Sequence, residues 1–346
     1  PAVECSGWDS GLRSLALPLS ILVGRPRPAS LWRVMAVIWH RKIGRMETRR
    51  IEMSMFDRRF EFGFNTVLLA TDLSPASEAA TAYAVRFARR YDAKITAVEV
   101  FDYAWAGSPR TGGIPSGLAV MQATVQEELE NLRVDLCKEN VCCEVTLIDG
   151  DPASEILRKI AETNVDLAIL GTHAREGWER LAWGSVAEKV LRRACCPTLT
   201  IGPRVMEPSK RELPFRNLLY ATDFSLQSMR AVSYAVALTN DCDACLHVLH
   251  VVPSSNEGSG QELIADRFKE LAKELSPDEA KIYRNSKYEV KAGDHIAEAL
   301  LMQADLDQAD LIVLGINRGF HLVSHLPNMT SHIIGEAKCP VLTISS

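Results

Sequence analysis

One succession of short apolar runs, turns and amphipathic stretches occurs twice in this chain, and this repeat limits its fold more than any other feature. The matching pairs are residues 65–74 and 217–225, residues 149–151 and 292–294, residues 167–171 and 311–315, and residues 196–201 and 339–344. The order of the pairs is the same in both copies, and the second copy is slightly shorter. Two homologous domains explain this arrangement better than chance.

Within the first copy, apolar runs alternate with stretches of helical pattern. Strands are expected at residues 66–70, 95–101, 144–148 and 167–170, and helices at residues 75 to about 90, about 118–138 and 153–162. We expect Ser74 to cap the first helix and Pro75 to occupy its first position. Strands that alternate with helices of this length require crossover connections, which build a parallel sheet covered on both faces. The predicted class is α/β.

Composition excludes several classes of protein. The chain has 346 residues, 47% of them hydrophobic and 24% charged, which is typical of globular proteins. A net charge of −5 argues against a general nucleic-acid binder, and no apolar run approaches the roughly 20 residues of a membrane span. Nine scattered cysteines are typical of reduced thiols rather than of a secreted disulfide framework. We therefore expect a cytoplasmic protein without nucleic-acid or membrane partners.

Three segments are expected along the chain. Residues 1–52 are arginine-rich and show no sustained helical or strand period, so we interpret residues 1–60 as a disordered or artefactual extension, with a natural start near Met53 or Met55. A targeting peptide and a basic arm are the interpretations left open. The first domain is expected at residues 61–204 and the second at 215–346, joined by a polar linker that carries three prolines.

The stretch from Leu170 to Pro197 concentrates the chemistry of the first copy. It joins an apolar strand to a helix, and Gly184 and Ser185 stand directly before the helical pattern. The first backbone N–H groups of a helix have no partner within it and lie at the positive end of its dipole, so this point is a candidate anion site. An alternative needs no ligand: Ser185 and Glu188 have the spacing of a capping box.

With these landmarks placed, residues 65–344 resemble a tandem universal stress protein. The most specific element is G-x-x-G-(x)9-G-[ST], which in this family marks members that bind ATP. Here it is Gly171-Thr172-His173-Ala174, nine residues, then Gly184-Ser185, with alanine in place of the middle glycine. The resemblance implies two Rossmann-like domains, each a five-stranded parallel sheet of strand order 3-2-1-4-5 with helices on both faces.

The resemblance also implies a site for ATP, with or without Mg²⁺, between the first and fourth strands of the first domain. Asp72 follows the first strand and would contact the nucleoside. The residues implied at the nucleotide are Ala70, Thr71, Asp72, Val100, Gly171, Thr172, Ala174, Arg175, Gly184, Ser185, Val186 and Ala187. No nucleophile, general base, metal site or G-x-x-x-x-G-K-[ST] loop accompanies them, so a binding protein rather than an enzyme is expected, with slow ATP hydrolysis left open.

The second copy lacks the phosphate-binding residues. Arg318 stands at the middle glycine, and Pro327-Asn328 stands at the Gly-Ser position, where proline offers no N–H. We expect this domain to be structural or to bind something else. Single-domain relatives dimerise through their last strand, which implies that residues 198–201 and 341–344 pair within this chain, with a homodimer left open. The alternative function is an interaction module that acts through a protein partner without nucleotide.

Overall fold

The computed structural model describes residues 63–74, 77–102, 115–172, 185–206, 213, 215–254, 286–316 and 329–345. The expected extension at residues 1–60 therefore lies outside the described residues. So do Pro75, the loop residues Ala174, Arg175 and Gly184, and the second-copy residues Arg318, Pro327 and Asn328.

Strands and helices alternate through both copies. The first copy contains β1 (Thr66–Ala70), α3 (Glu78–Tyr91), β2 (Lys94–Phe101), α5 (Pro115–Lys138), β3 (Cys143–Asp149), α6 (Pro152–Glu162), β4 (Leu167–Gly171), α7 (Ser185–Arg193) and β5 (Thr198–Ile201). The second contains β6 (Asn217–Ala221), α8 (Leu226–Cys242), β7 (Cys245–Val252), β8 (Ser286–Ala292), α11 (Ile296–Leu306), β9 (Leu311–Ile316), α12 (Met329–Glu336) and β10 (Val341–Ser345). The expected α/β class is confirmed.

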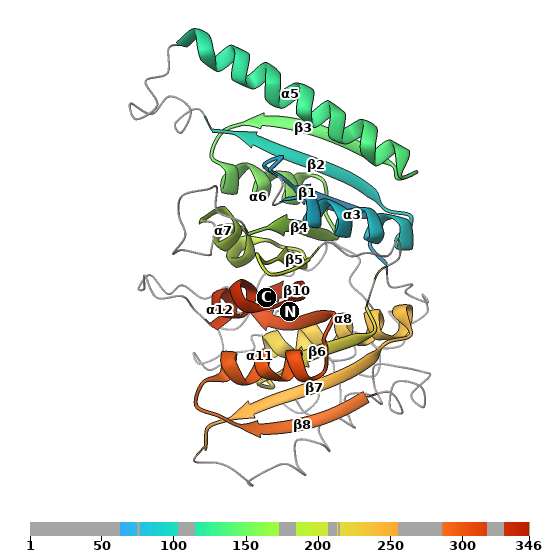
Figure 1. The fold of residues 1–346 in the computed structure, drawn as a ribbon, viewed down its shortest axis with the longest axis vertical. Helices are drawn as coiled ribbons and strands as arrows, with labels where there is room; N and C mark the ends of the chain where they lie inside the picture. Colours follow the sequence, from blue (N-terminus) through green and yellow to red (C-terminus); the bar gives the residue numbers. More distant parts are fainter. Residues whose placement is uncertain are drawn as a thin grey trace, which may run out of the picture.

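The ten strands form one sheet in the order β3-β2-β1-β4-β5-β10-β9-β6-β7-β8 (Figure 1). Each half is parallel and has the expected order 3-2-1-4-5. The halves join where β5 and β10, the strands named above for pairing within the chain, run antiparallel. Leu342 lies opposite Leu199, and Thr343 Oγ1 donates a hydrogen bond to the carbonyl of Thr198 at 3.2 Å.

Helices cover both faces of the sheet. The side chains of α3 and α8 belong to one apolar cluster that contains residues from both domains. On the opposite face, α6 and α7 cover the first half, while α11 and α12 cover the second, over two apolar clusters, and Leu191 of α7 belongs to the cluster of the second half. The two domains therefore share a core on the α3 and α8 face.

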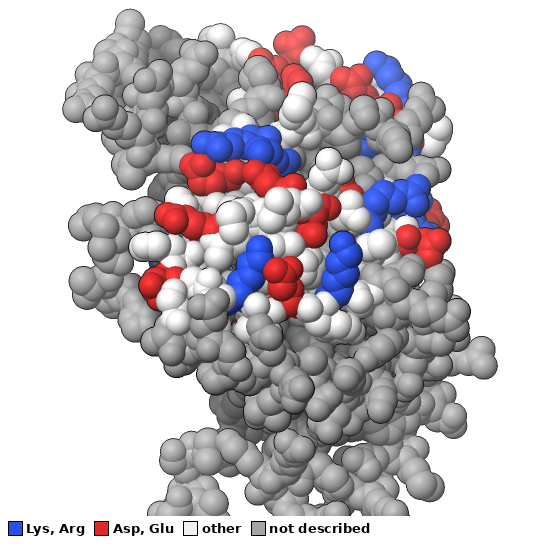
Figure 2. All heavy atoms as spheres, turned by 60° about the horizontal axis from the view of Figure 1, so that its bottom comes forward, with Lys and Arg blue, Asp and Glu red and all other residues white. Residues whose placement is uncertain are grey.

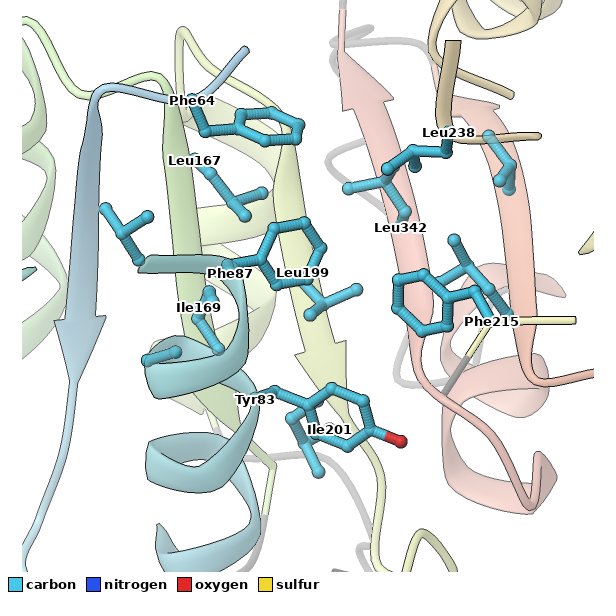
Figure 3. Packing of buried hydrophobic residues seen from close by; sticks show 14 of the residues in the cluster. Phe64, Tyr83, Phe87, Leu167, Ile169, Leu199, Ile201, Phe215, Leu238 and Leu342 are labelled. Carbon is cyan, nitrogen blue, oxygen red and sulfur yellow. The ribbon is translucent and has the colours of Figure 1, made fainter. Parts of the chain in front are cut away.

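Aromatic side chains hold the domains together in this shared core (Figure 3). Phe215 precedes β6 in the second domain but packs against α3 of the first. Its ring centroid lies 6.3 Å from that of Tyr83 in a stacked arrangement and 5.9 Å from that of Phe87 in an edge arrangement. A polar contact lies nearby, where the hydroxyl of Tyr91 donates a hydrogen bond to Asp241 Oδ2 at 2.8 Å.

The first helix begins later than expected, and the expectation for Ser74 was wrong. α3 starts at Glu78 with Ser77 at its N-cap, whereas Ser74 donates its hydroxyl to Asp72 Oδ1 at 2.6 Å. In the second copy the corresponding serine, Ser225, does cap α8 and accepts a hydrogen bond from the N–H of Ser228. A serine that follows an aspartate by two residues can bond either to the carboxylate or to the helix, and only the surrounding structure decides.

Tyr91, which bonds to Asp241 of the other domain, makes the free energy of unfolding fall at alkaline pH. Burial and the negative charge of Asp241 raise the pKa of the Tyr91 phenol well above its ordinary value of 10. Above about pH 10 the unfolded chain loses this proton while the folded protein keeps it, so the free energy of unfolding falls by about 1.4 kcal/mol per pH unit for each such tyrosine.

We expect the Tyr91→Phe variant to show a shallower fall in the free energy of unfolding above pH 10, by about that amount per pH unit. Urea unfolding at several values from pH 9 to pH 11.5 measures both slopes. Burial raises the pKa of Tyr83 and Tyr220 in the same direction, so a residual slope remains in the variant. Equal slopes in the two proteins would contradict the role given to Tyr91.

Candidate functional site

The strand order reverses at β1, which lies between β2 and β4. Ala70, the last residue of β1, stands opposite Val98 of β2 on one side and Leu170 of β4 on the other. In open α/β sheets, ligands bind at such a reversal, outside the carboxyl ends of the strands. The predicted site residues Ala70, Thr71, Asp72, Gly171 and Thr172 therefore meet at one edge of the sheet.

One apolar cluster connects this edge to the start of α7. Ala70 and Val100, from the ends of β1 and β2, belong to the same cluster as Ala187, and Val186 packs against it. Because α7 returns from the end of β4 to the start of β5, its N-terminus lies at the carboxyl edge of the sheet. Four of the predicted residues are thus brought together beneath that edge.

Asp72 stands exposed at the turn after β1, with its carboxylate oriented by that turn. Its Oδ1 accepts hydrogen bonds from the N–H of Ser74 at 3.1 Å and from the hydroxyl of the same serine at 2.6 Å. Leu73, between them, has a φ of 56°. The aspartate therefore has a structural task in the turn as well as a position at the site.

The second copy repeats this turn. Asp223 Oδ1 accepts a hydrogen bond from the N–H of Ser225 at 2.9 Å, and Phe224 has a φ of 58°. The second copy lacks the phosphate motif named above and still keeps the turn. The turn by itself therefore does not distinguish a nucleotide site from a structural one.

Two threonines of the predicted site use their hydroxyls within the protein. Thr71 Oγ1 accepts a hydrogen bond from the N–H of Leu73 at 3.0 Å and lies 3.0 Å from the Ser77 hydroxyl. Thr172 is 2% exposed, and its hydroxyl donates to the carbonyl of Ile201 at 3.3 Å. These side chains stabilise the edge of the sheet, so a ligand would meet the backbone here rather than the hydroxyls.

The first turn of α7 differs in detail from the capping box considered above. The helix already includes Ser185 as its first residue. Glu188 forms an ion pair with Arg192, one turn later, at 2.8 Å. The N–H groups of the first turn, from Ser185 to Ala187, remain outside the i to i−4 pattern of the helix, as in every helix start.

Gly315 of β9 corresponds to Gly171 at the end of β4 and shows why a glycine stands near the end of the fourth strand. A Cβ atom at Gly315 would stand 2.2 Å from the carbonyl oxygen of Gln227 and 2.4 Å from the nitrogen of Ser228. The first turn of α8 thus packs directly on the strand backbone. In the second copy, packing alone requires this glycine.

The Gly-Asp-Pro motif begins a helix. Asp151 is the N-cap of α6, and its Oδ2 accepts a hydrogen bond from the N–H of Ser154 at 3.0 Å, while Pro152 occupies the first position. Hydrogen bonds from Ser154 lower the pKa of the Asp151 carboxyl. Lys189 of α7 lies 3.7 Å from Asp151 Oδ1 and connects the two helices that cover this face.

Sequence reasoning missed a pair of structural aspartates. Asp166 Oδ2 accepts hydrogen bonds from the N–H groups of Asn65 and Thr66, at 2.9 and 3.0 Å. Asp310 does the same for Arg216 and Asn217 in the second copy. The repeated aspartate before each fourth strand was the available signal.

The two histidines of β7 bond within the protein. His247 is buried beside α11, where its Nδ1 bonds to Asp307, and His250 Nδ1 lies 2.6 Å from the carbonyl of Thr222. Among the described residues, no group of three or more His, Cys, Asp and Glu side chains is arranged to hold a metal ion.

The described surface adds two observations. In Figure 2, Lys and Arg side chains are interspersed with Asp and Glu side chains, and neither sign covers a large continuous area of this face. Of the helices in the described part of the chain, none combines the length and the apolar character needed to cross a membrane.

Comparisons with known proteins agree with the repeat. The model of the universal stress protein family matches residues 63–202 and 214–345. A universal stress protein of Methanocaldococcus jannaschii is 30% identical over 139 residues, which are 40% of this chain and 82% of that protein. Universal stress protein YxiE of Bacillus subtilis is 29% identical over 146 residues, covering 40% of this chain and 99% of that protein.

A solved structure supports the fold over both copies. The crystal structure of a universal stress protein from Archaeoglobus fulgidus superposes with a TM-score of 0.64 at 21% identity, covering 82% of this chain and 99% of that one. Together with the family match on both halves, these likenesses show that the chain belongs to the universal stress protein family.

Proposed function

We propose that the first domain binds an adenine nucleotide, ATP with or without Mg²⁺, and that the protein acts in the cytoplasm as a stress-response regulator rather than as an enzyme. The observation that carries this proposal is the apolar cluster that joins Ala70 and Val100 to Val186 and Ala187. It puts the start of α7 at the same edge as the exposed Asp72 carboxylate. The family motif at Gly171, Gly184 and Ser185 supports the same ligand.

Each part of the edge suits one part of the ligand. Ala70 and Val100 are 8% and 9% exposed, so they form the boundary of the apolar cluster at the carboxyl edge of the sheet, where a planar base can lie. The Asp72 carboxylate has the chemistry to accept hydrogen bonds from ribose hydroxyls. The N–H groups and dipole of the α7 start suit phosphate oxygens, and Mg²⁺ would be bound chiefly by the phosphates.

Nucleotide binding is tested with Asp72→Ala against Asp223→Ala. Saturating ATP, at about 100-fold its dissociation constant, should stabilise the wild-type protein by about 2.7 kcal/mol. Asp72→Ala should lose most of this stabilisation and Asp223→Ala should keep it. Thermal unfolding with and without ATP, together with calorimetric titration, measures both.

The two variants are a matched pair because each aspartate accepts a hydrogen bond from the serine two residues later. Each substitution should therefore destabilise its turn by a similar amount, so the two variants should differ only in the stabilisation that ATP adds. If ATP at millimolar concentration leaves the unfolding of the folded wild-type protein unchanged, the nucleotide proposal fails.

The alternative is an interaction module that binds a protein partner without nucleotide. The turn at Asp223 repeats that at Asp72 in a copy without the phosphate motif, which favours this alternative because the turn there has a structural role. Purified protein free of bound nucleotide, with partner capture that is unaffected by added ATP, is the result expected from the alternative.

A further inference from the structure

Three cysteines lie where α5 passes into β3, the outermost strand of the first domain (Figure 1). Cys137 is exposed in the last turn of α5, Cys142 is exposed in the connection, and Cys143 is half-buried as the first residue of β3. This is the amino edge of the sheet, at the opposite end of the strands from the nucleotide site proposed above. Nothing in that proposal uses these thiols.

Two of the three sulfur atoms are in contact. Cys137 Sγ lies 3.6 Å from Cys143 Sγ. A disulfide bond is about 2.05 Å long, so the sulfur atoms need to approach by only about 1.5 Å, within reach of side-chain rotation. Arg133 lies beside them, with Nη1 3.8 Å from Cys137 Sγ and its guanidinium also held by Glu130.

The connection that carries these cysteines is held on both sides. The N–H of Asn140, whose φ is 56°, donates to the carbonyl of Cys137 at 3.0 Å. Arg89 of α3 donates its Nε–H to the carbonyl of Glu139 at 3.0 Å and forms an ion pair with the Glu139 carboxylate. The two sulfur atoms are therefore kept near each other by the fold, which favours reaction between them over reaction with a second molecule.

Their surroundings give Cys137 and Cys143 different roles in an oxidation. Burial, together with the neighbouring Cys137, raises the pKa of the Cys143 thiol to about 11, so Cys143 is a thiol at neutral pH. Cys137 is open to solvent and to small reagents. An oxidant therefore meets Cys137 first, and Cys143 is placed to complete the reaction.

We propose that Cys137 and Cys143 form a redox-active dithiol that is oxidised by small disulfides of the glutathione class. The Cys137 thiolate attacks one sulfur of the small disulfide, which forms a mixed disulfide and releases one small thiolate. Cys143, after losing its proton, attacks the Cys137 sulfur and expels the second small thiol. One protein disulfide forms, and the small disulfide is reduced to two thiols by two electrons and two protons from the protein.

The test exposes the full, reduced chain to oxidised glutathione and maps disulfides by mass spectrometry of peptides prepared without reductant. We expect the Cys137–Cys143 disulfide to form at least about tenfold faster than adducts at the exposed Cys195 and Cys245. No glutathione should remain on Cys137. The closed loop should also raise the melting temperature of the oxidised protein by about 5 °C.

Single substitutions distinguish the roles of Cys137 and Cys143. Cys143→Ser should retain glutathione on Cys137, because nothing completes the reaction, while Cys142→Ser should behave as the wild-type protein does. Cys137→Ser changes an exposed residue, so it should fold even if Cys143→Ser does not, and it should abolish the disulfide. A stable glutathione adduct on wild-type Cys137, a main disulfide that uses Cys142, or a main product linked between chains would each overturn the proposal.

Discussion

Replacing Phe215 with alanine is expected to lower the free energy of unfolding by about 3–5 kcal/mol, the usual cost of removing a buried phenyl ring. Phe215 is fully buried and packs on Tyr83 and Phe87 of the other domain. The cavity would open in the cluster that the two domains share, where backbone on both sides limits collapse. Urea unfolding followed by circular dichroism measures the loss.

A matched control is Met206→Ala, which removes a side chain that is 84% exposed in the connection between the domains. Its effect should stay within about 0.5 kcal/mol. If Phe215→Ala does not fold, Phe215→Leu keeps most of the volume and should lose about 1–1.5 kcal/mol. A loss below about 1 kcal/mol in Phe215→Ala would mean that the shared core does not hold the domains together as described.

Gly315→Ala is expected to destabilise the second domain by about 3 kcal/mol or more, because the added Cβ meets backbone rather than a flexible side chain. The nearest atoms would be the carbonyl oxygen of Gln227 at 2.2 Å and the nitrogen of Ser228 at 2.4 Å. Relief requires the first turn of α8 to move away from β9. Thermal unfolding of the variant measures the effect.

Gly293→Ala is the control for this change, since it adds the same atom where the nearest neighbours stand at 3.6 and 3.8 Å. That distance is ordinary contact, and the backbone there is not in the left-handed region. Gly293→Ala should be neutral or slightly stabilising, by up to about 1 kcal/mol, because alanine restricts the unfolded chain. Equal stability of the two variants would show that α8 does not pack on Gly315.

The class and order of elements were predictable because the signals are local. Apolar runs of four to eight residues separated by turn residues specify buried strands, and the repeat doubles the information. The positions of the strands were correct to within one residue in β2, β3 and β4. The strand order came from the family resemblance, since no local pattern states which strand lies beside which.

Predictions that depended on a choice between equally good hydrogen-bond partners were less secure. Ser74 has the sequence context of a cap, yet it bonds to Asp72, while Ser225 in the same context caps α8. Ser185 and Glu188 have the spacing of a capping box, yet Glu188 pairs with Arg192. Short polar side chains can satisfy several neighbours at similar free energy, so tertiary packing selects among them.

The sequence predicted the positions of the candidate site residues better than it predicted their hydrogen bonds. The sequence placed Asp72 after β1 and Gly171 at the end of β4, and both lie at the edge where the strand order reverses. It did not indicate that the hydroxyls of Thr71 and Thr172 are used within the protein. The Ile201 carbonyl that Thr172 bonds is distant in the chain, whereas Thr71 bonds the nearby Leu73 and Ser77.

The sequence by itself determined two repeated α/β units, the residues of their strands and the loss of the phosphate motif in the second unit. The tertiary structure alone decided how the units share a core around Phe215, which packing requires Gly315, and that Cys137 meets Cys143. Strands and helices follow from the pattern of apolar and polar residues, which involves only neighbours along the chain. Contacts between distant segments depend instead on how helices pack on strands, and contacts between the two domains depend on the register with which β5 and β10 join the two halves of the sheet.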